Sequence, residues 1–413
     1  MMSEAQLILD RCDELATHSS RESGIERVYL SAEHRAVNDL AGEWMREAGL
    51  ATWQDAAGNL CGRLEGSRPG LPALLIGSHL DTVPGAGRYD GILGVLAAIA
   101  VAGRIPRGEL PFAVEVVAFG DEEGTRFGTT LLGSRALAGT WRPEWAALVD
   151  KDGMTLGEAA TAFGLDPARI GDAARNPDSL VGYLEAHIEQ GPLLEDAGRA
   201  LGVVTSIAAA RRLLITLIGE ARHCATPWNL RRDALVGASE AILAIERLAR
   251  RHGSPATVGH ISVEPDAVNV IPGVAEFSLD LRHESAEGRD AAWGAIRAEI
   301  DRIAAARGLR VDVVETHTAP AVHCAPELRD VIRAGIRRTG DSDPLELHSI
   351  AGHDAMAVAA VTTVGMLFVR CKGGISHHAD ESVLVEDVAV AVDALHAAVL
   401  AFATRGLAAG TAP

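Results

Sequence analysis

One loop in this chain, between a predicted strand and a predicted helix, restricts the folds that the whole sequence can adopt. The apolar run at 71–76 predicts a buried strand, and the apolar pattern at 92–105 predicts a helix. Between them lie His79, Asp81 and Asp90, which can bind metals or transfer protons. In open α/β sheets, ligands collect beyond the carboxyl ends of the strands. We therefore expect this loop to hold part of a metal centre and other strand ends to supply the rest.

Three further predicted strands also end in acidic or histidine-bearing segments. They are 112–119, followed by Glu122 and Glu123; 180–188, which contains His187; and 361–369, followed by His377. A single histidine near a strand end is more often a structural residue, but the combination favours a metal site. Imidazole and carboxylate ligands suit zinc, and also manganese, cobalt or nickel. A two-metal centre needs a bridging carboxylate, for which Asp90 is the candidate because glycines near it allow close backbone approach.

The middle of the chain predicts a second, smaller domain. Its elements are a strand at 212–219, a helix at 231–252, strands at 257–264 and 274–282, a helix at 286–306 and a strand at 309–315. This β-α-β-β-α-β order is that of a ferredoxin-like module. We therefore predict an inserted domain at 211–320, within a catalytic α/β domain formed by residues 1–210 and 321–413.

Charge and cysteine usage exclude several classes of partner. The 413 residues carry a formal net charge of −18, which argues against nucleic acid or an anionic membrane as a partner. The five cysteines are dispersed, as expected for reduced thiols in the cytosol. The N-terminus has no basic region followed by an apolar stretch, so a signal peptide is not expected. These features predict a cytoplasmic protein that binds neither nucleic acid nor an anionic membrane.

The motifs around these residues resemble those of the amidase/hydantoinase/carbamoylase family, a branch of the di-zinc aminoacylase-type metallopeptidases. The resemblance covers nearly the whole chain, in family order. It rests on Gly-Ser-His-Leu-Asp-Thr-Val-Pro at 77–84, Asp-Gly-Ile-Leu-Gly at 90–94, Asp-Glu-Glu-Gly-Thr-Arg-Phe at 121–127, His-Ile-Glu-Gln-Gly-Pro at 187–192, Asn-Val-Ile-Pro-Gly at 269–273, Gly-His-Asp-Ala at 352–355 and Gly-Ile-Ser-His at 374–377.

This resemblance implies a mixed-sheet catalytic domain that binds two metal ions, with an inserted dimerisation domain. The implied metal ligands are His79, Asp90, Glu123, His187 and His377, with Asp90 bridging. Asp81 would orient His79 through its ring N–H. Glu122 would be the general base, which takes a proton from the attacking water and passes it to the leaving nitrogen.

The family likeness also implies how the substrate is held. The small domain would form a homodimer and send His223, Asn269 and Arg282 into the partner's site. His223 would stabilise the oxyanion, and Arg282 would pair with a substrate carboxylate. Gln190 would bond the ureido or amide group, and His353 would line the pocket.

Several positions depart from the family pattern, all on the substrate side. The loop after His223 is one residue shorter than usual and contains Trp228. Ile350 stands where the family commonly has glycine, and His378 follows the predicted ligand His377. We therefore expect the reaction class to be kept and the substrate pocket to differ.

The sequence thus predicts a metal-dependent amidohydrolase for an N-carbamoyl-L-amino acid, which acts through metal-bound hydroxide with Glu122 as base. Allantoate, 3-ureidopropionate and N-acyl amino acids or dipeptides are alternative substrates. A covalent mechanism through Cys224 beside His223 is disfavoured, because adjacent loop residues seldom align as nucleophile and base. A non-catalytic metal-binding scaffold is the alternative from another class, and the intact set of ligands and base argues against it.

Overall fold

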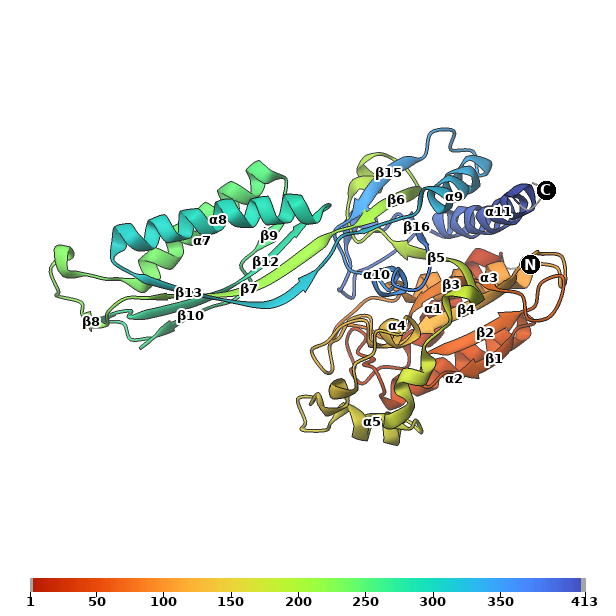
Figure 1. Cartoon of the computed structure of the whole chain (residues 1–413), viewed down its shortest axis with the longest axis horizontal. Helices are drawn as coiled ribbons and strands as arrows, with labels where there is room; N and C mark the ends of the chain where they lie inside the picture. The colour runs from red at the N-terminus through yellow and green to blue at the C-terminus, as the bar shows by residue number, and fades with distance from the viewer. Residues whose placement is uncertain (1–2, 410–413) are drawn as a thin grey trace. The chain divides into compact units, whose positions relative to one another are not determined.

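Parallel strands form the centre of a nine-stranded mixed sheet in the computed structural model, which describes residues 3–409 (Figure 1). The adjacent parallel strands are, in spatial order, β4 (Ala113–Phe119), β3 (Ala73–His79), β5 (Leu180–Ile188) and β16 (Val364–Val369). Antiparallel strands flank them: β2 (Leu60–Leu64) and β1 (Ala51–Gln54) beside β4, and β6 (Leu201–Ile207) beside β16. Two more strands, β14 (Val322–His323) and β15 (Leu345–Ser349), pair with β6.

The register of the parallel strands brings their carboxyl ends to one edge of the sheet. His79 at the end of β3 pairs with Phe119 at the end of β4. Val369 at the end of β16 pairs with Ile188 at the end of β5. All residues of β3, β4 and β16 are buried, as expected for apolar strands covered on both faces.

Amphipathic and apolar helices cover this sheet and share a large apolar core with it. The longer ones are α1 (Glu4–Ala16), α2 (Ala32–Glu47), α3 (Ile92–Arg104), α9 (Pro326–Arg338) and α11 (Val385–Ala409). Shorter ones are α4 (Leu132–Leu137), α5 (Leu156–Ala162), α6 (Leu193–Asp196) and α10 (Ala355–Val358). Short 3-10 turns η1 (Pro143–Ala147), η2 (Pro167–Ala173), η3 (Pro177–Ser179) and η5 (Lys372–Gly374) complete this part.

Helix α11 is the one helix within residues 3–409 that is long and apolar enough to cross a membrane by length and composition. Its apolar window, Val385–Arg405, is 50% buried within the fold. Val388, Val392, Leu395 and Val399 lie in the core at helical spacing. These contacts are those of a core helix.

The chain divides into two compact units. The first comprises Met1–Thr205, His323–Leu347 and Gly352–Pro413, and the second comprises Ser206–Val322 and His348–Ala351.

The second unit has its own sheet and its own apolar core. Its strands are β7 (Ala209–Ile218), β9 (Ala256–Thr257), β10 (Ile261–Glu264), β12 (Val274–His283) and β13 (Arg310–Ala319). Helices α7 (Ala234–His252) and α8 (Ala286–Arg307) pack on it, and both end in a left-handed glycine. A short ribbon of β8 (Arg222–His223) and β11 (Val270–Ile271), with the turn η4 (Trp228–Leu230), lies beyond one end of β7.

The predicted α/β fold with a mixed sheet is confirmed, and most element boundaries agree within a few residues. Two of the longer strands, β6 and β15, were not predicted, although β6 is an apolar run, and neither were the two-residue strands β8, β11 and β14. The predicted strand at 257–264 is interrupted and forms β9 and β10.

Candidate metal centre

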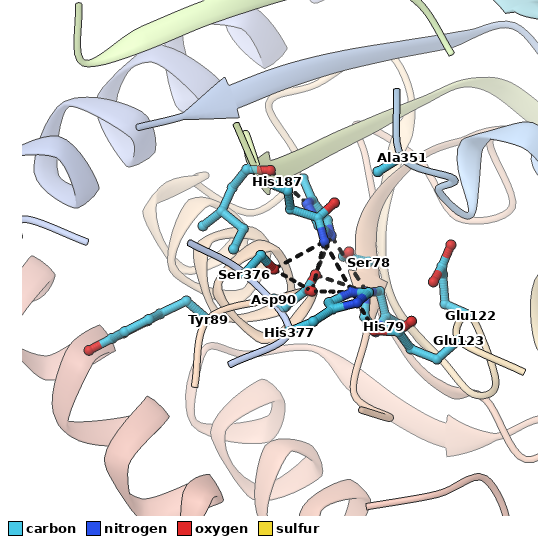
Figure 2. Close-up of polar contacts among 12 residues, drawn as sticks. Ser78, His79, Tyr89, Asp90, Glu122, Glu123, His187, Ala351, Ser376 and His377 are labelled. Atoms are coloured by element: carbon cyan, nitrogen blue, oxygen red, sulfur yellow. Dashed lines mark hydrogen bonds and ion pairs between the residues drawn. The ribbon is translucent and has the colours of Figure 1, made fainter. Parts of the chain in front are cut away.

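The aligned strand ends bring the five predicted metal ligands together (Figure 2). His79 is the last residue of β3, and His187 is the last but one of β5. Glu123 follows β4, His377 follows β16, and Asp90 lies just before α3. Residues that are up to 298 positions apart in the sequence thus meet because parallel strands share one edge.

The first ligand group consists of His79, Asp90 and His187, all of them buried. Oδ1 of Asp90 lies 3.1 Å from Nε2 of His187 and 3.7 Å from Nε2 of His79. The two Nε2 atoms are 3.5 Å apart. Three potential ligand atoms therefore converge on one small, buried volume.

The tautomers of the two histidines fit a bound cation. Nδ1 of His79 lies 3.0 Å from the carbonyl oxygen of Asp81, and Nδ1 of His187 lies 2.9 Å from the carbonyl oxygen of Ile188. A carbonyl can only accept, so each Nδ1 carries the hydrogen. Each Nε2 then presents a lone pair toward Asp90 and toward the other ring. This arrangement is unfavourable without a cation between the lone pairs and suits a divalent metal.

The second ligand group consists of Asp90, Glu123 and His377. Oδ2 of Asp90 lies 3.0 Å from Nε2 of His377, which in turn lies 3.3 Å from Oε1 of Glu123. The two carboxylate oxygens of Asp90 are thus divided between the two groups. This is the geometry that a bridging carboxylate requires, and the nitrogen and oxygen donors suit zinc, manganese, cobalt or nickel.

The electrostatics of the metal-free centre show what the metals replace. Burial favours neutral His187, but Asp90 outweighs it and raises the pKa of His187 to about 9. Asp90 and Glu123 raise the pKa of His377 to about 10. Burial opposes ionisation of Asp90, yet hydrogen bonds with His187 and His377 bring its pKa well below the usual range. In the free protein, protons therefore occupy positions that metal ions would take.

Asp81 lies next to the ring N–H of His79, and its main chain makes the contact. Its backbone carbonyl is the acceptor closest to Nδ1 of His79, while its carboxylate is 3.6 Å away. The carboxylate instead accepts the backbone N–H groups of Glu122 at 3.0 Å and Glu123 at 3.1 Å. Asp81 therefore orients the histidine through its main chain and the acidic pair through its side chain.

The Glu122 side chain points away from the contacts that join Asp90 and His377 (Figure 2). One of its oxygens lies within 4.8 Å of a ring nitrogen of His79 and of an oxygen of Glu123. Burial, followed by the charges of Glu123 and Asp354, raises the pKa of Glu122 well above the usual range. A carboxylate that is easily protonated next to a metal centre is suited to transfer protons.

Three of the six non-glycine residues with positive φ within residues 3–409 lie at this centre. Asp121, Gln190 and His377 adopt left-handed conformations, with φ of 65°, 55° and 57°. Gly91 has φ of 72°, and a Cβ atom there would lie 2.4 Å from the His79 ring. Such conformations in residues other than glycine are typical of functional sites, and composition or periodicity does not predict them.

Two of the predicted substrate residues, Gln190 and His353, belong to the first unit, and only Gln190 has an unused polar atom placed to meet a substrate. Nε2 of Gln190 donates to Oδ2 of Asp90 at 2.8 Å, and its buried Oε1 has no hydrogen-bond partner within residues 3–409. His353 is fully buried, with its ring packed edge-on at 4.5 Å against His187. Because no part of His353 reaches solvent, this geometry does not support the predicted contact with substrate, and it places the ring behind a metal ligand.

The other predicted substrate residues lie at two ends of the second unit. His223 pairs with Val270, and the Asn269 carbonyl accepts the N–H of Cys224, so His223 and Asn269 are neighbours. Arg282 lies near the end of β12, opposite Ala210. The β7–β12 ladder therefore separates Arg282 from His223.

This separation corrects the prediction that the partner supplies all three residues. Val274, where β12 begins, lies next to the β8–β11 ribbon, and Arg282 is eight residues further along the extended strand. At about 3.4 Å per residue this is roughly 27 Å. A small substrate cannot span it, so one chain cannot supply His223, Asn269 and Arg282 to one site.

The exposed Cys224 is not placed as a nucleophile. Its Sγ lies 3.9 Å from Nδ1 of His223, and that nitrogen already accepts the N–H of Ala225 at 3.1 Å. Trp228 is 81% exposed and stacks on the Arg231 guanidinium at 3.8 Å. In this unit, Trp228 therefore lies on the surface of the shortened loop.

Two residues that contact the ligands were not identified from the sequence. Ser376 Oγ lies 2.9 Å from Oδ2 of Asp90, and Glu381 bonds the backbone of Asp90. Their proximity in sequence to His377 was the available signal.

Comparison with known proteins places the chain in one group. Residues 75–401 match peptidase family M20/M25/M40. The chain is 41% identical over 400 residues to an N-carbamoyl-L-amino acid amidohydrolase of Geobacillus stearothermophilus. The alignment covers 96% of this chain and 98% of that protein. It is 40% identical over 419 residues to allantoate deiminase of Arabidopsis thaliana, with coverage of 92% and 79%. The crystal structure of a hydantoinase/carbamoylase family amidase from Burkholderia multivorans superposes with a TM-score of 0.87 at 33% identity, over 97% of this chain and 98% of that one.

Proposed function

The chain belongs to peptidase family M20/M25/M40 and is a metal-dependent amidohydrolase, and we propose that its substrate is an N-carbamoyl-L-amino acid. The observation that carries the reaction is the division of the Asp90 oxygens between two ligand groups beside Glu122. The name of the relative that is 41% identical supports the substrate. Allantoate is the second candidate, because a relative of nearly equal identity is an allantoate deiminase.

Two divalent ions held by the ligand groups, with zinc the first candidate, would lower the pKa of a water molecule and polarise the substrate carbonyl. Glu122 would take a proton from the attacking water and transfer it to the nitrogen that leaves. Water and substrate would yield the amino acid, carbon dioxide and ammonia. Asp81 would keep Glu122 and Glu123 in place through their backbone N–H groups.

His223 is prepared to donate a hydrogen bond to the developing oxyanion. Because the N–H of Ala225 donates to its Nδ1, that nitrogen carries no hydrogen in the neutral ring, and Nε2 does. A donor aimed at the oxyanion contributes roughly 10²–10³ in rate. Asn269, next to His223, would add a second polar contact.

Arg282 keeps two donors for a carboxylate. Its Nε and Nη2 donate to Asp280 at 2.9 and 3.2 Å, and its Nη1 donates to the Ile350 carbonyl at 2.7 Å. A guanidinium has five N–H bonds, so one remains on each terminal nitrogen. These two can bind both oxygens of the α-carboxylate, and Asp280 and Ile350 fix the plane of the fork.

Gln190 supplies an acceptor for the ureido group. Its Nε2 is engaged with Asp90, which leaves the buried Oε1 to accept a substrate N–H. A buried acceptor without a partner is costly, and a ureido nitrogen would satisfy it.

The separation of His223 from Arg282 supports a homodimer. Each site would take His223 and Asn269 from one chain and Arg282 from the other. The second unit would then be the dimerisation domain, as the sequence predicts for 211–320. The predicted location in the cytoplasm is retained as part of this proposal.

The test is ammonia release by protein reconstituted with Zn²⁺, Mn²⁺ or Co²⁺ across carbamoyl amino acids, allantoate, 3-ureidopropionate and acyl amino acids. Glu122→Gln should retain both metals and lose roughly 10²–10⁴ in kcat. Glu158→Gln is the matched control, since Glu158 bonds only Thr155 at the start of α5. Full activity of Glu122→Gln would refute its role as base. No turnover of any substrate by the metal-loaded protein would favour the scaffold alternative.

A further inference from the structure

We propose that Glu381 is a positioning residue that holds the bridging ligand Asp90 and the His377 segment in register. Glu381 lies four residues after His377 and is only 4% exposed. It lies outside both ligand groups. The inference rests on the metal centre of the proposed function and is independent of the substrate.

The Glu381 carboxylate joins two segments that are far apart in the sequence. Its Oε1 accepts the backbone N–H of Tyr89 at 2.7 Å and that of Asp90 at 3.1 Å. Its Oε2 accepts the hydroxyl of Ser376 at 3.0 Å. Since Ser376 immediately precedes His377, one side chain fixes the backbone of one ligand and the neighbour of another (Figure 2 shows Tyr89, Asp90, Ser376 and His377).

Glu381 also controls the single hydrogen of the Ser376 hydroxyl. Oγ of Ser376 lies 2.9 Å from Oδ2 of Asp90 and 3.0 Å from Oε2 of Glu381. One hydrogen serves one acceptor fully. When the hydrogen points to Glu381, Oδ2 of Asp90 keeps a lone pair for a metal in the second ligand group.

The position of Glu381 depends on Gly87, in the loop between β3 and α3. A Cβ atom on Gly87 would lie 2.3 Å from Cβ of Glu381 and 2.6 Å from its Oε1. Gly87 does not have a positive φ. Gly87→Ala would therefore displace the Glu381 side chain from its Cβ outward, without changing any charge.

The contacts predict a selective defect. The first ligand group takes two of its three ligands, His79 and His187, from the ends of β3 and β5, and Glu381 bonds neither of them; it reaches this group only through the backbone of the shared ligand Asp90. The second ligand group depends on the position of His377 relative to Oδ2 of Asp90, which Glu381 sets through Ser376 and the Asp90 N–H. In Glu381→Gln, the amide NH₂ would face the Ser376 hydroxyl and donate to its oxygen. The hydroxyl would then donate its own hydrogen to Oδ2 of Asp90, where that hydrogen competes with the metal.

The experiment is titration of the metal-free full-length protein with Co²⁺, followed by calorimetry and by the visible absorption of bound cobalt. Wild type should bind two ions. Glu381→Gln and Gly87→Ala should each weaken the binding of one ion at least tenfold and alter its absorption spectrum, while the affinity for the other ion changes less. Circular dichroism establishes that each variant is folded, and Glu158→Gln should bind both ions as wild type does.

Two results would overturn the inference, and they are distinguishable. If wild type binds two ions and both variants bind them with wild-type affinities, Glu381 does not position the second ligand group, while the proposed function stands. If wild type itself fails to bind two Co²⁺ ions, the two-metal centre and the inference fall together. If Glu381→Gln does not fold, Gly87→Ala alone decides between these results.

Discussion

The division of the substrate residues between two chains can be tested with a heterodimer of two defective variants. One chain carries His223→Ala and the other carries Arg282→Ala, and two different affinity tags allow the mixed dimer to be purified after co-expression. His223→Ala removes an oxyanion donor and should cost roughly 10²–10³ in rate in its homodimer. Arg282→Ala removes charge-assisted bonds of about 1.5–3 kcal/mol, which is roughly 10- to 100-fold.

The ladder predicts how much activity the mixed dimer recovers. Because roughly 27 Å of extended strand separates the two residues, each site of the proposed dimer would take one residue from each chain. In the mixed dimer, one site receives intact His223 and intact Arg282, and the other receives neither. We therefore expect about half of the wild-type kcat/KM per dimer, far above either parent.

The measurement is kcat/KM for ammonia release per dimer, from rates at substrate concentrations well below KM, where a loss of substrate binding is visible. A wild-type/His223→Ala heterodimer is the control, and it should also show about half of the wild-type rate because one of its sites is intact. The reasoning is refuted if this control keeps half of the activity while the His223→Ala/Arg282→Ala dimer is as slow as its parents. Both residues would then act from one chain.

Three further outcomes are expected. Burial lowers the pKa of His34 from 6.5 to about 3 in the folded protein. As pH falls below about 6.5, His34 therefore takes up a proton in the unfolded chain but not in the folded one, and the free energy of unfolding decreases. The free energy of unfolding of the metal-free protein, measured in urea, should fall between pH 7.5 and pH 5 by about 2 kcal/mol less in His34→Gln than in wild type. An equal fall in both proteins would contradict this. Binding of metal at pH 7.5 should release close to two protons, one each from His187 and His377, and fewer protons as pH rises through 9 and 10. The release can be measured with an indicator dye in weak buffer. Gly91→Ala should lose metal from the first ligand group, because its Cβ would meet the His79 ring at 2.4 Å and φ is 72°; retained stoichiometry by atomic absorption would be the contrary result.

Local patterns in the sequence were sufficient for the strands and helices that carry the ligands. The apolar runs before Asp81 and Glu122 are β3 and β4, and the ligands follow them as predicted. Strand β6 was missed although it is apolar, since nothing local distinguishes a short edge-side strand from a loop that packs on the core.

The roles of individual side chains were predicted less well than their proximity. Asp81 was expected to orient His79 through the ring N–H; only the structure shows that its backbone carbonyl makes this contact and that its carboxylate accepts the backbone N–H groups of Glu122 and Glu123. His353 was expected at the pocket wall and lies buried behind His187. Which atom of a side chain makes a contact depends on the path of the backbone through each loop, and a motif does not contain this information.

The sequence by itself determined which residue types stand at the strand ends, and hence the fold class, the metal chemistry and the acidic pair. Those features follow from periodicity and motif spacing, which are local properties of the chain. Only the tertiary structure decided that Asp90 turns one oxygen to each ligand group, that Glu381 connects Asp90 to the His377 segment, and that Arg282 lies far from His223. Each of these depends on strand register and on contacts between residues distant in sequence, which packing fixes only when the whole chain has folded.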